Sequence, residues 1–241
     1  MRSLCFLLAL PFVAAAPAVA QHGSPDPEEV AELAVRLTNE FRAQEGRQRV
    51  ASNARLLDAA RYFADYMAKT GRFGHEADGA TPAARAKQHG YDYCVVSENI
   101  AYEYSSAGFA TRELAQGFVE GWKRSPGHRR NMLDPDVTET AVAVAQGTPG
   151  HYYAAQLFGR PLAQAVRFSV ANRSPATIRY RVDDKGFSLA PRQTRTHQSC
   201  RPGEIEFDWP GRQQEAKVRP RNGERYAVVR SDAGRFALQT E

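Results

Sequence analysis

The spacing of apolar residues changes once along this chain, and that change limits the folds it can adopt. Before Asp134-Pro135 the apolar residues recur three or four positions apart, which is typical of helices that bury one face. After it, Thr140, Val142 and Val144 alternate with alanines, which is the period of a β-strand. Helices followed by strands predict an α+β fold for the first part of the chain.

The expected helices have recognisable start and stop signals. Asp26 can cap the first one, Pro27 suits a first helical position, and glycines follow the ends of the first three. The predicted helices run from Pro27 to Gly46, from Asn53 to Gly71, from Thr81-Pro82 to Gly90 and from Thr111 to Trp122. Ser125-Pro126 then predicts a fresh cap and first turn, with Ser125 as the cap.

A hairpin closes the first predicted domain, residues 27–160. Its first strand alternates from Thr140 to Ala145, the segment Gly147-Thr148-Pro149-Gly150 supplies the turn, and Tyr152 to Phe158 forms the second strand. Short strands separated by turn residues then predict a small antiparallel sandwich or barrel over residues 165–241. The candidate strands are Val166–Ala171, Thr177–Val182, Phe187–Leu189, Thr194–Ser199, Ile205–Trp209, Arg225–Arg230 and Arg235–Gln239.

The N-terminus has the order of a secretory signal peptide. Arg2 precedes an apolar run from Leu4 to Val13, and Ala18-Val19-Ala20 supplies the small residues that signal peptidase reads. The sequence therefore predicts cleavage after Ala20 and a secreted or periplasmic product. Prolines interrupt the apolar run, which is shorter than a membrane span, so no transmembrane segment is expected after cleavage.

Removal of residues 1–20 leaves two cysteines, Cys94 and Cys200, in a compartment where disulfides persist. A bridge between them is one interpretation and two free thiols are the other, because the sequence does not show whether their Cα atoms lie within bridging distance. The formal charge is +5, but the basic residues are scattered. Without a recognition motif, an exported chain of this kind is not expected to bind nucleic acid.

Three segments concentrate polar residues that helix packing does not require. They are residues 73–79, 97–101 and 122–133, which contain His75, Glu98 and His128. These ordered motifs are similar to those of the CAP superfamily, or SCP domain, of cysteine-rich secretory proteins, antigen 5 and plant pathogenesis-related 1, and in particular to its bacterial secreted branch. The resemblance runs from about Val30 to Gly159 and is carried by Leu37-Thr38-Asn39-Glu40-Phe41-Arg42, Gly46, His75, Thr81-Pro82-Ala83-Ala84-Arg85, Gly90-Tyr91, Ser97-Glu98-Asn99-Ile100-Ala101, Trp122, Ser125-Pro126-Gly127-His128-Arg129, Asn131-Met132-Leu133, Thr138-Glu139 and Tyr152-Tyr153-Ala154-Ala155-Gln156-Leu157-Phe158-Gly159.

The resemblance implies an α-β-α sandwich with a cleft that holds two histidines and two glutamates in eukaryotic members, some of which bind zinc there. His75 and Glu98 match two of these positions, whereas Ser125 and Tyr153 occupy the other two. In bacterial-type sequences His128 takes the place of the second histidine, so we expect His75, Glu98 and His128 to line one cleft. Glu139 is a candidate for a second carboxylate, and Ser125 is a further candidate for the cleft.

Two neutral imidazoles with one or two carboxylates can bind zinc or another divalent metal, with His75 and His128 as the expected ligands. The same groups also form a stable hydrogen-bonded cluster with no metal, so no cofactor is required. At the start of a helix, His128 is expected to resist protonation, because the helix dipole disfavours a cation there.

Three functions remain open from the sequence. The first is an extracytoplasmic binding module whose cleft takes a small apolar ligand, an envelope glycan or a protein partner. The second is a hydrolase in the same cleft, which uses either a metal-activated water or Glu98 as general base, with the two histidines as orienting and stabilising groups. The third is a structural envelope protein in which the His/Glu cluster ties helices to the sheet. The binding module ranks first, and no residue is assigned as catalytic.

Overall fold

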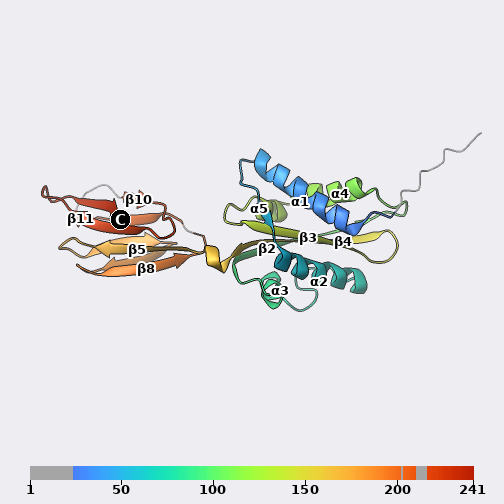
Figure 1. Ribbon diagram of the computed structural model, residues 1–241, viewed down its shortest axis with the longest axis horizontal. Helices are drawn as coiled ribbons and strands as arrows, with labels where there is room; N and C mark the ends of the chain where they lie inside the picture. The colour runs from blue at the N-terminus through green and yellow to red at the C-terminus, as the bar shows by residue number, and fades with distance from the viewer. Residues whose placement is uncertain (1–23, 202, 210–215) are drawn as a thin grey trace, which may run out of the picture.

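The protein has two lobes arranged end to end (Figure 1). The structure, a computed structural model, describes residues 24–201, 203–209 and 216–241. The predicted signal peptide, residues 1–20, lies outside the described residues. The first lobe contains the helices and one sheet, and the second contains only strands and turns.

The helices begin and end close to the positions that the sequence predicts. They are α1 (Pro27–Gln44), α2 (Ala54–Thr70), α3 (Pro82–Gln88), α4 (Thr111–Arg124) and α5 (Pro126–Met132). Asn53 caps α2 by accepting hydrogen bonds from the N–H groups of Arg55 and Leu56. Gly71 ends the same helix in the left-handed region, with φ of 68°, a conformation that glycine adopts without steric cost.

A four-stranded sheet lies at the centre of the first lobe, in the order β1-β3-β4-β2. Its strands are β1 (Ala51–Ser52), β2 (Tyr93–Tyr104), β3 (Glu139–Gln146) and β4 (His151–Pro161). The predicted β3–β4 hairpin is confirmed, but β2 is absent from the strands that apolar alternation predicted. Glu98 and Asn99 are buried at the middle of β2, and such polar residues interrupt the apolar pattern on which the prediction rests.

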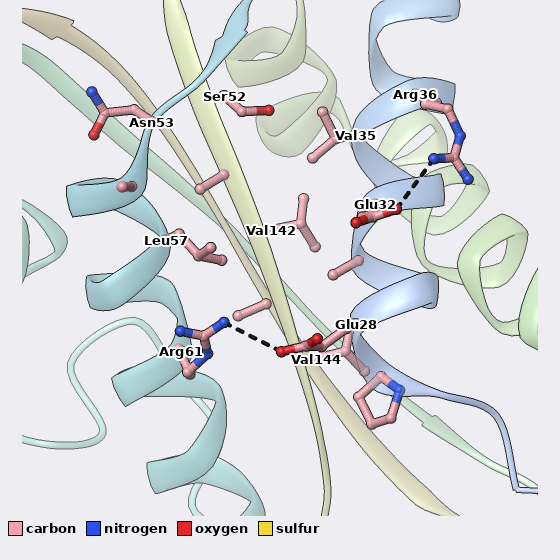
Figure 2. Close-up of a pocket in the computed structure, with 15 residues that line it drawn as sticks. Glu28, Glu32, Val35, Arg36, Ser52, Asn53, Leu57, Arg61, Val142 and Val144 are labelled. Atoms are coloured by element: carbon pink, nitrogen blue, oxygen red, sulfur yellow. Dashed lines mark ion pairs between the residues drawn. The ribbon is translucent and has the colours of Figure 1, made fainter.

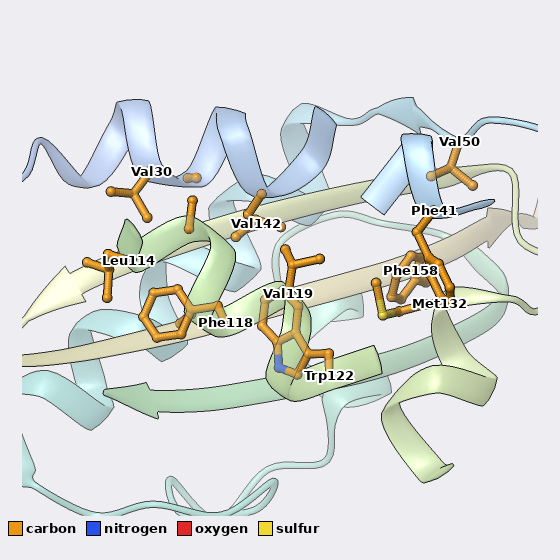
Figure 3. Close-up of a cluster of buried hydrophobic side chains, with 14 of the residues drawn as sticks. Val30, Phe41, Val50, Leu114, Phe118, Val119, Trp122, Met132, Val142 and Phe158 are labelled. Atoms are coloured by element: carbon orange, nitrogen blue, oxygen red, sulfur yellow. The ribbon is translucent and has the colours of Figure 1, made fainter. Parts of the chain in front are cut away.

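Helices cover both faces of this sheet, as the family resemblance implies (Figure 1). On one face, α1 and α4 enclose an apolar core that contains Phe118, Trp122 and Phe158 (Figure 3). On the other, α2 and α3 pack apolar side chains such as Phe63 against strand residues such as Leu157 of β4. The two layers bury the sheet between them and leave β2 as an edge strand that both layers can reach.

The second lobe is a sandwich of two four-stranded sheets, ordered β10-β9-β6-β7 and β12-β11-β5-β8. A short 3-10 helix, Leu162–Gln164, connects it to β4. Its strands are β5 (Val166–Asn172), β6 (Ile178–Val182), β7 (Lys185–Leu189), β8 (Thr194–Ser199), β9 (Ile205–Asp208), β10 (Ala216–Val218), β11 (Arg225–Arg230) and β12 (Phe236–Thr240).

Two details of this sandwich differ from the sequence prediction. Strands β5 and β11 pair in parallel, so the domain is not wholly antiparallel. The extra strand β10 was not expected, because three residues are too few to show a period. Apolar side chains that alternate inward from both sheets, including Tyr180, Phe207 and Tyr226, form the core between them.

A covalent bridge and an ion-pair group join the two lobes. Cys94 of β2 forms a disulfide with Cys200, and their Cα atoms are 5.2 Å apart, which confirms the pairing interpretation. Beside it, the Arg201 guanidinium lies 2.6 Å from Asp134 and 3.3 Å from Asp136, both in the loop before β3. These contacts attach the second lobe to the end of the first sheet.

Among the residues that the structure describes, no helix combines the length and apolar character needed to cross a bilayer.

The disulfide should contribute substantially to stability, because it closes a loop whose ends are 106 residues apart. Replacing both Cys94 and Cys200 with serine should lower the free energy of unfolding by about 2–5 kcal/mol. The measurement is urea unfolding with and without a thiol reductant. The reductant should lower the unfolding midpoint of the wild type to that of the variant, and it should not change the midpoint of the variant. Equal midpoints for wild type and variant would contradict the bridge.

Candidate functional site

Three side chains from distant parts of the chain lie together at the β2 edge of the sheet. His75 comes from the turn between α2 and α3, Glu98 from β2 and His128 from α5. His75 Nδ1 is 2.8 Å from Glu98 Oε1, and the ring centroids of His75 and His128 are 6.2 Å apart. We call these residues the site cluster. The His75 side chain is 47% exposed and that of Glu98 only 1%, so the carboxylate lies beneath the imidazole.

A buried arginine, which the sequence analysis did not assign to the site, neutralises Glu98. Arg85 of α3 donates from Nη2 to Glu98 Oε2 at 2.8 Å and from Nη1 to Asp78 Oδ1 at 2.7 Å. It also donates to the backbone carbonyls of His75 and Ala80. Its position in the sequence could have indicated this role. Arg85 ends the Thr81–Arg85 motif and, with Ala86, is buried in a short helix.

The Arg85 guanidinium is enclosed on its other side by α2. Its Cζ atom lies 3.5 Å from the centroid of the Phe63 ring, a cation–π contact, and the side chain is fully buried. Such a buried pair is costly to break, because the partner left behind is an unpaired charge in a low-dielectric interior. Arg85 therefore fixes the turn that carries His75 as well as the Glu98 carboxylate.

The bond between His75 and Glu98 sets the histidine tautomer. An ionised carboxylate can only accept hydrogen bonds, so Nδ1 of His75 carries the proton. In the neutral ring Nε2 is then an acceptor, on a side chain that is nearly half exposed. His75 can therefore accept a hydrogen bond from a ligand.

His128 adds a second imidazole. Its backbone carbonyl accepts a 3.3 Å hydrogen bond from Asn99 Nδ2. Burial lowers the pKa of His128 and the neighbouring His75 lowers it further. The direction agrees with the expectation from the start of α5, but these two causes, rather than the helix dipole, account for it.

A chain of buried amides holds α5 against the sheet. Alternation along β2 turns Asn99 to the face opposite Glu98, where it accepts from Asn131 Nδ2 at 3.0 Å. Asn99 Nδ2 donates to Gln156 Oε1 at 3.2 Å, and Gln156 Nε2 donates to Thr38 Oγ1 at 3.0 Å. The Glu98-Asn99 pair therefore serves both layers, since Glu98 binds Arg85 and Asn99 positions the helix that carries His128.

Two other predicted site residues lie outside the site cluster. Glu139 is on β3, two strands away from β2, and its Oε2 accepts a 2.6 Å hydrogen bond from Tyr91. Ser125 occupies the N-cap position of α5, but its side chain makes no capping hydrogen bond. The capping role expected for the Ser125 hydroxyl is therefore not seen.

The side chains of the site cluster do not fit a catalytic zinc site. Such sites have three protein ligands, whereas here His75 and His128 are two donors and the Glu98 carboxylate is already bound to Arg85 and His75. Across the described ranges, no group of three or more His, Cys, Asp or Glu side chains is arranged to hold a metal ion. The site's chemistry is therefore derived from its imidazoles and their hydrogen bonds.

Exposed aromatic side chains continue the site along the same face of the sheet. Tyr102 and Tyr104 follow Glu98 on β2 at intervals of two, so all three point to the face of α2. Tyr102 Oη lies 2.6 Å from His151 Nδ1, and the ring centroids of Tyr104 and His151 are 4.4 Å apart. We call the complete set the aromatic row: the exposed Phe73, Tyr102 and Tyr104, with the partly exposed His151 and the buried Tyr153 that contact Tyr102.

The aromatic row was missed because its members come from three separate segments. Phe73 lies two residues before His75, and its ring centroid is 6.4 Å from that of Tyr102. Phe73, Tyr102 and Tyr104 are 53%, 42% and 55% exposed, unusually high values for large apolar side chains. Tyr102 and Tyr104 are two residues apart, as expected for neighbours on one face of a strand, and this spacing could have indicated the aromatic row.

The lowered pKa of His128 predicts a specific pH dependence. The folded state resists protonation at this ring, so its contribution to stability should fall as the pH drops below about 6.5, the ordinary histidine value. His75→Ala should raise the pKa of His128 toward that value, as measured by NMR titration of the imidazole. His197 in the second lobe, whose pKa is also lowered by burial, is the control and should not move. A wild-type His128 that titrates above 6.5 would contradict the assignment.

Comparisons with known proteins identify the family of the first lobe. The model of the Cysteine-rich secretory protein family, CAP, matches residues 35–158. The uncharacterized protein YkwD of Bacillus subtilis (strain 168) is 27% identical over 127 residues, which are 52% of this chain and 46% of YkwD. The chain thus matches about half the length of this curated relative.

Solved structures of bacterial surface and extracellular proteins are also similar to this chain. An outer surface protein from Borrelia burgdorferi shares the fold, with a TM-score of 0.50 and 19% identity, over 58% of this chain and 98% of that one. An extracellular SCP-domain protein from Bacillus anthracis str. Ames has a TM-score of 0.46 and 23% identity, over 56% of this chain and 41% of that one. Because the family match extends over more than half of its 241 residues, this chain belongs to the CAP superfamily of cysteine-rich secretory proteins.

Proposed function

We propose that this protein is an exported, non-catalytic binding module that takes a saccharide of the cell envelope on the site cluster and the aromatic row. The observation that carries the proposal is the aromatic row itself. Its exposed tyrosines lie on the same face of β2 as Glu98, and Tyr102 contacts Phe73, two residues before His75. Export rests on the signal-type segment at residues 1–20.

A saccharide suits this surface better than an apolar ligand or a protein. The rings of Tyr102 and Tyr104 offer flat apolar area with hydroxyl groups at the edge, which complements a sugar ring that has apolar C–H faces and a rim of hydroxyls. The imidazoles of His75 and His128 add hydrogen-bonding groups beside the rings. An apolar ligand would favour an enclosed cavity, and the aromatic row is open.

The state of Glu98 favours binding over catalysis. A general base must be free to take a proton and must reach the reacting atom. The Glu98 side chain is 1% exposed, and its two oxygens bind His75 and Arg85. Glu98 is therefore best explained as the group that orients His75.

A hydrolase is the second candidate, and one observation favours it. His75 hydrogen-bonded to Glu98 resembles a general base held by an orienting carboxylate. A general base of this kind typically contributes about a hundredfold to the rate. If the wild-type protein turned over an ester, amide or glycoside substrate about a hundredfold faster than the His75→Ala variant, a hydrolase would replace the binding module as the proposed function.

The test is calorimetric titration of the mature protein with the β-1,4-linked tetramer of N-acetylglucosamine. We expect a Kd on the order of 0.1 mM for the wild type. Tyr102→Ala and Tyr104→Ala should each weaken binding about tenfold, which corresponds to the ~1.4 kcal/mol expected from losing one stacked ring. Maltotetraose, a tetramer with another linkage, tests specificity.

The matched controls are Tyr62→Ala and Tyr93→Ala, which remove exposed tyrosines outside the aromatic row. They should leave the Kd unchanged, and circular dichroism should show all four variants folded. If neither tetramer binds at about 10 mM, or if the controls weaken binding equally, the saccharide proposal is wrong. A loss of stability in His75→Ala without any ligand effect would instead favour the structural role.

A further inference from the structure

The central sheet has an unpaired strand edge outside the proposed saccharide site. Strand β1 pairs with β3 only at Glu139 and Thr140 and then leads into α2. Beyond Thr140, β3 continues to Gln146, paired on its other side with β4, and no strand of the described chain covers its outer side. More than half of β3 is thus a free edge.

The backbone groups at this edge can be assigned from the hydrogen bonds around it. The carbonyl of Thr140 accepts from Asn53 N–H, so Thr140 directs its backbone polar groups away from β4. In an antiparallel pair the direction alternates, so Val142 and Val144 present their N–H and C=O groups to the same outer side. Unpaired backbone groups in a poorly hydrated groove are costly and favour a partner that pairs with them.

An apolar groove of about 600 Å³ surrounds this edge. Figure 2 shows β3 running along its floor between α1 and α2. Val35 of α1 and Leu57 of α2 lie on opposite walls, with Ala31 and Ala54 beside them. None of the residues of the site cluster lines this groove. Its volume is within the range of ligand sites.

We propose that the groove binds an extended peptide segment of another protein, which adds a strand to β3. Free N–H and C=O groups in a row are complementary to a polypeptide backbone, and an acyl chain could not satisfy them. The four β3 residues in the groove, Ala141 to Val144, span about 13 Å, enough to pair with about four peptide residues. Alternate peptide side chains would face the two apolar walls, so small apolar residues fit best.

The groove is open to such a peptide at little cost. Arg61 Nη2 of α2 lies 3.6 Å from Glu28 Oε1 of α1 and spans one end of the groove (Figure 2). Their side chains are 50% and 83% exposed, and ion pairs this exposed contribute little to stability. A peptide can displace this ion pair and use the same charges to bind polar residues at its end.

The probe is the peptide acetyl-Lys-Val-Ala-Val-Ala-Lys-amide, added to the mature protein and followed by NMR-detected hydrogen exchange. At saturation the amides of Val142 and Val144 should exchange at least about tenfold more slowly, because they become hydrogen-bonded. A second peptide with its central amides N-methylated keeps the side chains but loses the backbone donors, and it should not bind.

Two variants fill the groove without touching the edge. Val35→Trp and Leu57→Trp should each weaken peptide binding at least tenfold, whereas Glu40→Trp, on an exposed position of α1 outside the groove, should not. Saccharide binding should be the same in all three. The two variants alter opposite walls of the groove. If one of them does not fold, the other still tests peptide binding.

Three outcomes would overturn the proposal. The first is unchanged exchange of Val142 and Val144 at about 1 mM peptide, and the second is equal binding of the N-methylated peptide. The third is occupation of the groove by palmitate that excludes the peptide and leaves these amides exchanging freely, which would make the groove an acyl-chain site.

Discussion

Arg85 lies fully buried between the Phe63 ring of α2 and the Glu98 carboxylate of β2, and the rest of the site depends on this contact. The guanidinium also binds Asp78 and the backbone carbonyl of His75, so one side chain connects two helices, the intervening turn and the edge strand. Because a buried charge is tolerated when it is paired and hydrogen-bonded, as Nη1 and Nη2 of Arg85 are here, the arrangement requires these partners together. It therefore fixes where His75 lies and leaves its outer nitrogen available to a ligand.

This constraint also explains why we propose a binding role, and not catalysis, for a set of residues that includes two histidines and a glutamate. A carboxylate that neutralises a buried arginine is a poor proton acceptor in a reaction, but it orients an imidazole well. The neighbouring His128 is kept neutral by burial and by His75. The site thus combines two imidazoles with the aromatic row, while the groove along β3 lies on a different part of the same sheet.

The fold was predictable where a local signal decided it. Caps and glycines gave the helices nearly residue by residue, and alternation gave the β3–β4 hairpin. Strand β2 escaped because its centre carries buried polar residues whose partners are distant in sequence. The family motifs predicted the cluster of His75, Glu98 and His128. The role of Arg85, the aromatic row and the parallel pairing of β5 with β11 could not be predicted in this way, because they depend on tertiary contacts that leave no local sequence pattern.

The most direct test of this account is a double-mutant cycle of Arg85→Met and Glu98→Gln, with the free energy of unfolding measured in urea. A buried, charge-assisted pair should give a coupling energy of at least about 2 kcal/mol. The same cycle at the exposed pair of Lys87 and Asp92, made with Lys87→Met and Asp92→Asn, should give a much smaller coupling energy, because solvent screens that pair. If the effects at Arg85 and Glu98 are additive within about 0.5 kcal/mol, the two side chains do not act as a unit and the account is wrong.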